Sequence, residues 1–163
     1  MYLLSKIELE ELNRASQPLI SKFSEEHAGD SHYYFRFGGT TADFVGRRAP
    51  ITNDVLSLPP AEVIQVHVLE SVVLPWNVLA LLGTPTSLIR SGVQLLHGPS
   101  IDPGYSGAIE LGVLNVTKEP LKLSLGEPIL KALFFDLTSV RESAHIPEIV
   151  RRRLDFEQSD FSL

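Results

Sequence analysis

Residues 62–74 read EVIQVHVLESVVL, and this stretch carries the clearest secondary-structure pattern in the chain. Apolar and polar residues alternate through EVIQVHVLE, and the run LKLSL at residues 121–125 alternates in the same way. A period of two places every second side chain on one face of a β-strand, whereas an amphipathic helix repeats every 3.6 residues. Both stretches are therefore predicted to be strands with one buried face.

Other short β-prone runs lie on either side of this strand. They read YYFRFGG, DVLSLPP, NVLALLG, LIRSGVQLL, GAIELGVLNV and PILKALFFDL. Turns rich in glycine and proline, such as GTPTS, TKEP and GEP, separate many of them. Short strands at regular spacing predict an all-β fold of the sandwich, jelly-roll or barrel type. The polar stretch SEEHAGDSH before YYFRFGG predicts a loop.

One short helix is predicted near the N-terminus, at residues 5–15. Ser5 is followed three residues later by Glu8, which is the capping-box pattern of a helix start. Three apolar side chains of this helix can pack one face onto the sheet: Ile7, Leu9 and Leu12.

The 163 residues contain no internal repeat, low-complexity segment or linker, so a single domain over residues 1–163 is predicted. Within it, residues 1–20 hold the N-terminal helix and residues 139–163 form a C-terminal tail. The tail contains RRR at residues 151–153, which is interpreted as a solvated helix face, a subunit contact or a phosphate contact.

Composition excludes several classes of protein. The formal net charge of −6 argues against a partner that is a nucleic-acid polymer, because such proteins carry a basic surface. The absence of cysteine excludes disulfides, thiolate catalysis and cysteine-bearing zinc sites. Charges interrupt the N-terminal MYLLSKIELEEL, so no secretory signal is predicted, and the apolar residues 72–82 are too short to span a bilayer. A cytoplasmic protein without a membrane partner is expected.

Local catalytic and metal motifs are also missing from the sequence. The five histidines form no HxH, HxxxH or HExxH spacing, so no local metal site is predicted. Neither GxxxxGK[ST] nor GxGxxG follows a predicted strand, and no GxSxG occurs. The remaining candidates are polar residues in the turns between strands.

Two of these turns carry side chains suited to ligand binding. In TPTSLIRSG, residues 84–92, hydroxyls and the guanidinium of Arg90 can bind an oxyanion, although an ordinary turn accounts for the same residues. In IDPGYSG, residues 101–107, Asp102 can orient a water molecule or accept a sugar hydroxyl, and Tyr105 can stack on a ring. Alternatively, Asp102 caps the turn through its own backbone and Tyr105 fills space.

Taken together, these segments resemble the dCTP deaminase and trimeric dUTPase superfamily. The resemblance covers roughly residues 55–138 and rests on LPPAEVIQVHVLESVVLPWNVLALLGTPTSLIRSGVQL, IDPGYSGAIELGVLN and PLKLSLGEPILKALFFDL in this order. It implies a distorted jelly-roll-like β-barrel. It further implies a homotrimer with active sites between subunits, and a pyrimidine deoxynucleoside triphosphate substrate, dUTP or dCTP, that carries Mg²⁺ on its phosphates.

The resemblance also assigns roles to individual residues. It implies a catalytic Asp102 that positions the attacking water. It implies substrate contacts from seven residues: Thr86, Ser87, Arg90, Gly98, Ser100, Tyr105 and Lys131. The glutamate that transfers protons in the deaminases corresponds to Gly112 here, and Glu110 lies two residues earlier on the same face of the predicted strand. Glu110 is therefore the second candidate catalytic residue.

Other positions depart from the family pattern. Tyr34 stands at an early motif aspartate, Pro85 at a basic residue, and Lys131 or Ala132 at a phosphate-binding glutamine. The glycine-rich C-terminal motif of dUTPases does not occur in RRRLDFEQSDFSL.

Three functions are compatible with this set of residues. The first is hydrolysis of dUTP to dUMP and pyrophosphate, with a water molecule held by Asp102. The second is deamination of dCTP, alone or combined with that hydrolysis to form dUMP, with Glu110 as the base. The third is a catalytically inactive nucleotide-binding or regulatory homologue.

Overall fold

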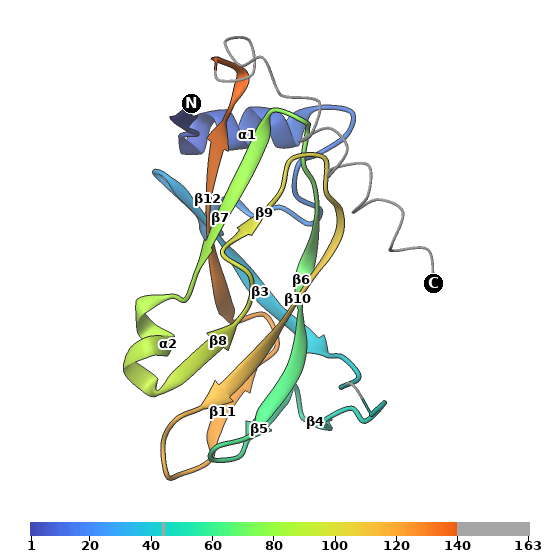
Figure 1. Cartoon of the computed structure of the whole chain (residues 1–163), viewed down its shortest axis with the longest axis vertical. Helices are drawn as coiled ribbons and strands as arrows, with labels where there is room; N and C mark the ends of the chain where they lie inside the picture. Colours follow the sequence, from blue (N-terminus) through green and yellow to red (C-terminus); the bar gives the residue numbers. More distant parts are fainter. Residues whose placement is uncertain (44, 140–163) are drawn as a thin grey trace, which may run out of the picture.

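The computed structural model of the chain describes residues 1–43 and 45–139, and the structural account below is confined to these ranges. Strands dominate this part of the chain (Figure 1). The strands are β1 Tyr2–Leu3, β2 Ala28–Gly29, β3 His32–Thr40, β4 Ile51–Thr52, β5 Val55–Leu58, β6 Val63–Val73, β7 Val78–Gly83, β8 Val93–Leu96, β9 Ser100–Ile101, β10 Ser106–Asn115, β11 Leu121–Ser124 and β12 Pro128–Asp136. The helices are α1 Lys6–Arg14, α2 Thr86–Ser91 and the 3₁₀ turn η1 Glu25–His27.

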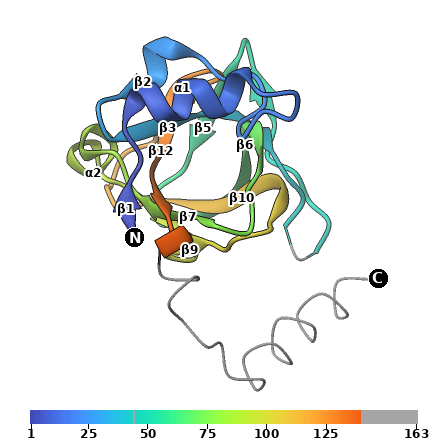
Figure 2. The same cartoon turned by 90° about the horizontal axis from the view of Figure 1, so that it is seen from above.

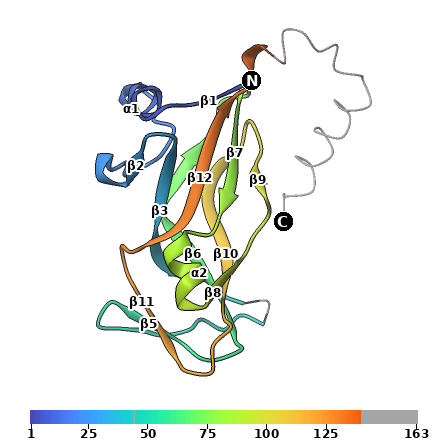
Figure 3. The same ribbon diagram turned by 90° about the vertical axis from the view of Figure 1, so that its left-hand side faces the viewer.

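Within the described residues, the main sheet has the strand order β8-β10-β6-β3-β12-β7-β9, with β1 added to β12 and β2 added to β3. Seen from above, this sheet curls around a common centre, and α1 lies across its outer side (Figure 2). A small sheet of order β11-β5-β4 lies at the end of the molecule opposite α1 (Figure 3). In the order of the main sheet, the short strand β9 is a terminal strand next to β7, and β8 is the terminal strand at the other end.

The predicted alternation of β6 is confirmed. Its burial pattern alternates along nearly the whole strand, with Ile64, Val66, Val68 and Val72 on the inner face. β3 alternates in the same way, and its aromatic side chains Tyr33, Phe35 and Phe37 are fully buried. The inner face of β6 also carries Glu70, which is 1% exposed. A charged residue at an inward position is the one exception to the apolar pattern of this strand.

The predicted N-terminal helix is confirmed together with its cap. The Glu8 N–H donates to Ser5 Oγ at 3.4 Å, and the Ser5 N–H donates to Glu8 Oε2 at 2.8 Å. Leu9 is fully buried and Leu12 packs against the core, but Ile7 is 67% exposed. The expectation that Ile7 packs onto the sheet was therefore wrong, because Leu9 and Leu12 alone complete the contact face.

Two regions differ from the strand prediction. Residues 88–96, LIRSGVQLL, do not form one strand, because α2 occupies Thr86–Ser91 and only Val93–Leu96 is extended. The chain leaves α2 through Gly92, whose φ of 88° is a left-handed conformation that terminates a helix at low cost. In the predicted loop before β3, η1 and β2 form short ordered elements. Within the described ranges, no helix is both long and apolar enough to cross a lipid bilayer.

Candidate functional site

The turn at residues 102–105 is closed by a hydrogen bond from the Tyr105 N–H to the Asp102 carbonyl, at 3.2 Å. Its central residues are Pro103, whose ring restricts φ, and Gly104, whose φ is +86°. Proline followed by a residue with positive φ is the sequence that a type II turn requires. Local chemistry therefore explains why the backbone bends at this point.

This turn does not connect a hairpin. β9 pairs with β7, whereas β10 pairs with β6 and β8. The turn is instead held by the end of β6, because Leu74 N–H donates to the Tyr105 carbonyl at 2.8 Å and Gly104 N–H donates to the Leu74 carbonyl at 3.1 Å. The chain thus crosses from one part of the curled sheet to another at Asp102, and the backbone of the crossing is fixed.

An open cleft of about 700 Å³ lies over this crossing. Its lining comes from the loop before β9, the turn, the first half of β10 and two outlying residues: Trp76, Leu82, His97, Gly98, Ser100, Ile101, Asp102, Pro103, Gly104, Tyr105, Ser106, Ala108, Ile109 and Glu110. Five of the sequence-predicted site residues are among them, namely Gly98, Ser100, Asp102, Tyr105 and Glu110. The structure therefore brings together one part of the predicted site.

The two carboxylates of the cleft, Asp102 and Glu110, are both exposed. The only side-chain partner of Asp102 among the described residues is Ser100, whose hydroxyl donates to Asp102 Oδ1 over a long 3.4 Å. The Tyr105 hydroxyl donates to the Ala108 carbonyl, which fixes the ring at the edge of the cleft. Partial burial raises the pKa of Tyr105, and the charge of Glu110 raises it further.

Within the described residues, neither lysine nor arginine lines this cleft. The cleft combines two carboxylates, hydroxyls, aromatic rings and backbone groups, which suit an uncharged ligand part such as a sugar or a base. Phosphates would lack counter-charges there. A negatively charged ligand part therefore has to find its cations elsewhere.

The predicted phosphate-binding residues lie on another part of the surface. Thr86, Ser87 and Arg90 belong to α2, are all exposed, and make no side-chain hydrogen bond or ion pair with other described residues. Lys131 pairs with Gly83, the last residue of β7, after which the chain continues into α2. The Lys131 ammonium is 6.0 Å from the centre of the Tyr34 ring. None of these four residues lines the 700 Å³ cleft.

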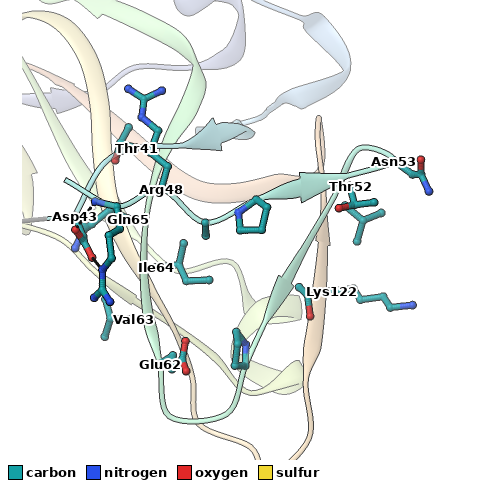
Figure 4. A pocket seen from close by; sticks show the side chains of 16 residues that line it. Thr41, Asp43, Arg48, Thr52, Asn53, Glu62, Val63, Ile64, Gln65 and Lys122 are labelled. Carbon is teal, nitrogen blue, oxygen red and sulfur yellow. Dashed lines mark hydrogen bonds and ion pairs between the residues drawn. The ribbon is translucent and has the colours of Figure 1, made fainter. Parts of the chain in front are cut away.

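A second open cleft, of about 740 Å³, lies between the β3–β4 connection, β6 and the small sheet (Figure 4). Its Asp43 and Arg47 pair with each other, with Arg47 Nε 3.2 Å from Asp43 Oδ2. Arg48 and Lys122 lie on opposite sides of this cleft and do not point toward one another. None of the sequence-predicted site residues lines it, so the cleft over the Asp102 turn is the stronger candidate.

Comparison with known proteins identifies the family of the chain. The family model for dCTP deaminase-like proteins matches residues 6–137. The chain belongs to the dCTP deaminase-like family. It is 31% identical over 127 residues to the dCTP deaminase of Pyrococcus horikoshii, a match that covers 73% of this chain and 76% of that protein.

Another relative matches over a smaller share of its own length. The chain is 30% identical over 91 residues to the dUMP-forming dCTP deaminase of Methanospirillum hungatei, which covers 55% of this chain and 49% of that protein. The matched stretch thus spans about half the length of this relative.

Solved structures of family relatives share the fold. The 2′-deoxycytidine 5′-triphosphate deaminase of Agrobacterium tumefaciens matches with a TM-score of 0.67 at 15% identity, over 81% of this chain and 47% of that chain. A dUTPase from phage phi11 of S. aureus, which coordinates a structural Mg(II) ion, matches with a TM-score of 0.53 at 14% identity, over 72% of this chain and 88% of that chain. The predicted superfamily and its curled, jelly-roll-like β fold are confirmed.

The position at which family deaminases are expected to carry their proton-transferring glutamate is a tightly packed glycine in this member. Gly112 is buried between Gln65 of β6 and Leu96 of β8. A Cβ atom at residue 112 would lie 3.1 Å from Val63 Cγ1 and 3.2 Å from Leu96 Cβ, so a side chain there requires its neighbours to move. Glu110 directly follows a β-bulge between Ala108 and Glu110, and it lines the cleft.

One lining residue, Trp76, was not predicted as part of the site. It stands 26 positions before Asp102, in the loop between β6 and β7, and its side chain is 54% exposed. Its only sequence signal is an aromatic residue in the short turn LPWN between two apolar runs. That signal does not indicate which part of the molecule the residue faces.

Proposed function

We propose that this family member is an enzyme of pyrimidine deoxynucleotide metabolism that hydrolyses dUTP to dUMP and pyrophosphate. The observation that carries this proposal is the placement of Asp102 in the cleft, exposed and with only a weak contact to Ser100. A carboxylate with unused acceptor positions can hold and deprotonate a water molecule. The water oxygen bonds to the α-phosphorus, the bond from that phosphorus to the bridging oxygen breaks, and Asp102 takes the proton.

The base and sugar are proposed to occupy the cleft, with Tyr105 and Ser100 against the sugar and Gly98 at the rim. This orientation is supported by the absence of lysine and arginine from the described lining, which leaves the phosphates without partners inside the cleft. Thr86, Ser87 and Arg90 offer hydroxyls and a guanidinium that no described residue already uses. Such groups are well suited to phosphate oxygens.

Because α2 does not line the same cleft, we place the phosphate-binding residues of one subunit against the Asp102 turn of another in a homotrimer. Lys131 is assigned to the phosphate side, near the segment that enters α2. The trimer is consistent with the family fold, and sedimentation of the full chain tests it. A monomer at all concentrations would contradict the shared site.

Mg²⁺ is proposed to arrive with the triphosphate. No group of three histidine, aspartate or glutamate side chains within the described residues is arranged to hold a metal, so the oxygens of the substrate have to supply most of the ligands. When bound there, the ion supplies positive charge to the phosphates. The residues of this chain position the nucleotide and the water.

Deamination of dCTP is the second candidate. It is supported by the names of the relatives, which are dCTP deaminases, and by the exposed carboxylate of Glu110 in the cleft. It is opposed by the glycine at residue 112, the position expected for the glutamate of the deaminases. If Glu110 is the base, Glu110→Gln abolishes ammonia release from dCTP and leaves pyrophosphate release from dUTP intact.

Phosphorus NMR with Mg²⁺ and either dUTP or dCTP, with ammonia assayed in the same tubes, separates the candidates. We expect pyrophosphate from dUTP and no ammonia from dCTP, and a loss of about 10²- to 10⁴-fold in turnover for Asp102→Asn. Unchanged turnover in Asp102→Asn would refute the assigned role. Nucleotide binding with no product in either tube would leave the chain as a nucleotide-binding or regulatory homologue.

A further inference from the structure

Trp76 is the only tryptophan of the chain and lines the cleft that contains Asp102. Its side chain is 54% exposed. Exposing so large an apolar ring is unfavourable, because tryptophan usually contributes most of its area to a core or an interface. The position of Trp76 at the cleft therefore costs free energy, because part of an apolar ring is exposed to water.

The indole ring lies directly against the substrate turn. A Cβ atom at Gly104 would lie 2.9 Å from both Cη2 and Cζ3 of Trp76. Only glycine permits this approach, and the same glycine carries the positive φ of the turn. The ring and the Asp102 turn thus form one continuous wall of the cleft.

The backbone that carries Trp76 is held on both sides. Val78 N–H donates to the Pro75 carbonyl at 3.0 Å, which closes a turn around Trp76. The Asn77 side chain donates to Asp136 Oδ2 at 3.1 Å and to Thr138 Oγ1 at 2.9 Å. The ring is consequently presented from a fixed loop.

The indole has unused binding capacity. Among the described residues, Trp76 has no hydrogen-bond acceptor for its Nε1–H and no aromatic ring stacked on it. With about half of its side chain exposed, Trp76 can contact a ligand in the cleft. A planar, largely uncharged ring is the ligand part that matches an aromatic face in an acidic cleft without cations.

We propose that Trp76 forms the aromatic wall of the ligand site and stacks on the pyrimidine ring of a nucleotide held at the Asp102 turn. This placement rests on the proposed function, because that function puts the base in the cleft. It adds a residue that recognises the base, whereas Asp102 acts at the α-phosphate. Trp76 is thus a ligand-contact residue with no part in the proton transfer.

Fluorescence of the full-length wild-type chain excited at 295 nm reports on Trp76 directly, since no other tryptophan is present. We expect saturable quenching by the α,β-imido analogues of dUTP and dCTP. Tripolyphosphate and 2′-deoxyribose 5-phosphate, which lack a base, should leave the emission unchanged. Emission that does not respond to analogues that bind in a calorimeter would overturn the proposal.

Variants test the same contact without the fluorophore. Trp76→Ala should weaken binding of the imido analogues roughly 5- to 150-fold, the range for loss of one base–aromatic stack. Trp76→Phe should retain most of the affinity. Tyr2→Ala is the matched control, because Tyr2 is 53% exposed and does not line the cleft. Equal affinity in wild type and Trp76→Ala would refute the contact.

The two proposals can fail separately. If turnover depends on Asp102 but not on Trp76, and the tryptophan fluorescence does not change with nucleotide, the stacking role of Trp76 is refuted and the hydrolase function stands. Quenching by the analogues without any turnover removes the hydrolase function alone. Emission that changes on dilution of the protein but not with nucleotide would assign the ring to a subunit contact and overturn the stacking role.

Discussion

Glu70 and Asp102 are both carboxylates, but they differ in burial and in the number of hydrogen bonds that they accept. Glu70 is 1% exposed and accepts from Arg36 Nε at 2.6 Å, from the Arg36 N–H at 3.0 Å and from the Tyr33 hydroxyl at 3.4 Å. Asp102 is exposed and has one long contact, to Ser100. The acceptor capacity of the first group is used by the fold, and that of the second remains available.

The network around Glu70 has a structural purpose. Arg36 Nη2 donates to the Lys22 carbonyl at 2.7 Å, and Ser24 N–H donates to the Tyr33 hydroxyl at 3.1 Å. These bonds fasten the segment before β2 to the central strands of the main sheet. A buried charge is tolerated when it is paired and fully hydrogen-bonded, so this group organises the fold. The comparison teaches that two carboxylates of the same chemical type differ in whether their acceptor positions are free for a ligand.

The largest expected effect on stability comes from Glu70→Ala. Removal of this carboxylate leaves the Arg36 guanidinium without its partner, which should lower the free energy of unfolding by about 3–5 kcal/mol. Urea unfolding followed by circular dichroism measures this loss. Asp102→Ala should stay within about 0.5 kcal/mol of wild type. Equal losses of unfolding free energy in the two variants would refute the claim that Glu70 stabilises the fold and Asp102 does not.

Gly104→Ala should have the next largest effect, because the added methyl meets Trp76 and the residue has positive φ. We expect a loss of about 1–3 kcal/mol in unfolding free energy. We also expect weaker quenching of the Trp76 fluorescence by nucleotide. Gly126→Ala is the matched control. Gly126 has a φ of +85°, and nothing lies within 4 Å of its added Cβ. The difference between the variants isolates the contact with Trp76.

Ser5→Ala should lower the unfolding free energy by about 1 kcal/mol, the usual cost of a lost helix N-cap. The Glu8 carboxylate lies between Glu70 and Asp102 in this comparison, because it accepts hydrogen bonds from the nearby Ser5. Hydrogen bonds from the Ser5 backbone and side chain lower the pKa of Glu8. The contribution of these bonds is present above the unfolded pKa of Glu8 and is lost as the pH falls through the lowered value. A smaller stability loss for Ser5→Ala at acid pH than at pH 7 would be consistent with this assignment.

The smallest effect is expected for Tyr33→Phe near neutral pH, at about 0.5–1 kcal/mol for a lost hydrogen bond. Burial raises the pKa of Tyr33 to about 12. Between about pH 10 and 12 the unfolded tyrosine loses its proton before the folded one, so stability falls as the pH rises. Urea midpoints measured across this range should decline less in Tyr33→Phe than in wild type. An identical decline would place the titration on other tyrosines.

Several features follow from local sequence, and they were predicted correctly. The alternation in EVIQVHVLE predicts β6, Ser5 with Glu8 predicts the start of α1, and Pro103 with Gly104 predicts the turn. Each depends on residues within a few positions of one another. The order of the family segments was likewise readable, and it identified the fold. The prediction of one strand through LIRSGVQLL was wrong for its first half, because the two apolar residues Leu88 and Ile89 fit a helical turn as well as a strand.

The candidate site was predicted only in part. Asp102, Tyr105, Ser100, Gly98 and Glu110 share a cleft, as expected for residues close in sequence. The grouping of Thr86, Ser87, Arg90 and Lys131 with them stays a prediction that depends on a second subunit. The RRR segment at residues 151–153 lies outside the described residues, as does most of the predicted tail. Trp76 was missed because its role depends on a contact with Gly104, which is 28 positions away.

By itself, the sequence determined the β character of the chain, the first helix, the turn at Pro103 and Gly104 and the family, because these depend on local periodicity and short motifs. Only the tertiary structure decided which strands pair, that β9 joins β7 and not β10, and that the curl sets Trp76 against the turn. It also decided that Glu70 points inward to Arg36 while Asp102 faces solvent. Strand pairing and burial are settled by contacts between distant segments, and no local pattern contains that information.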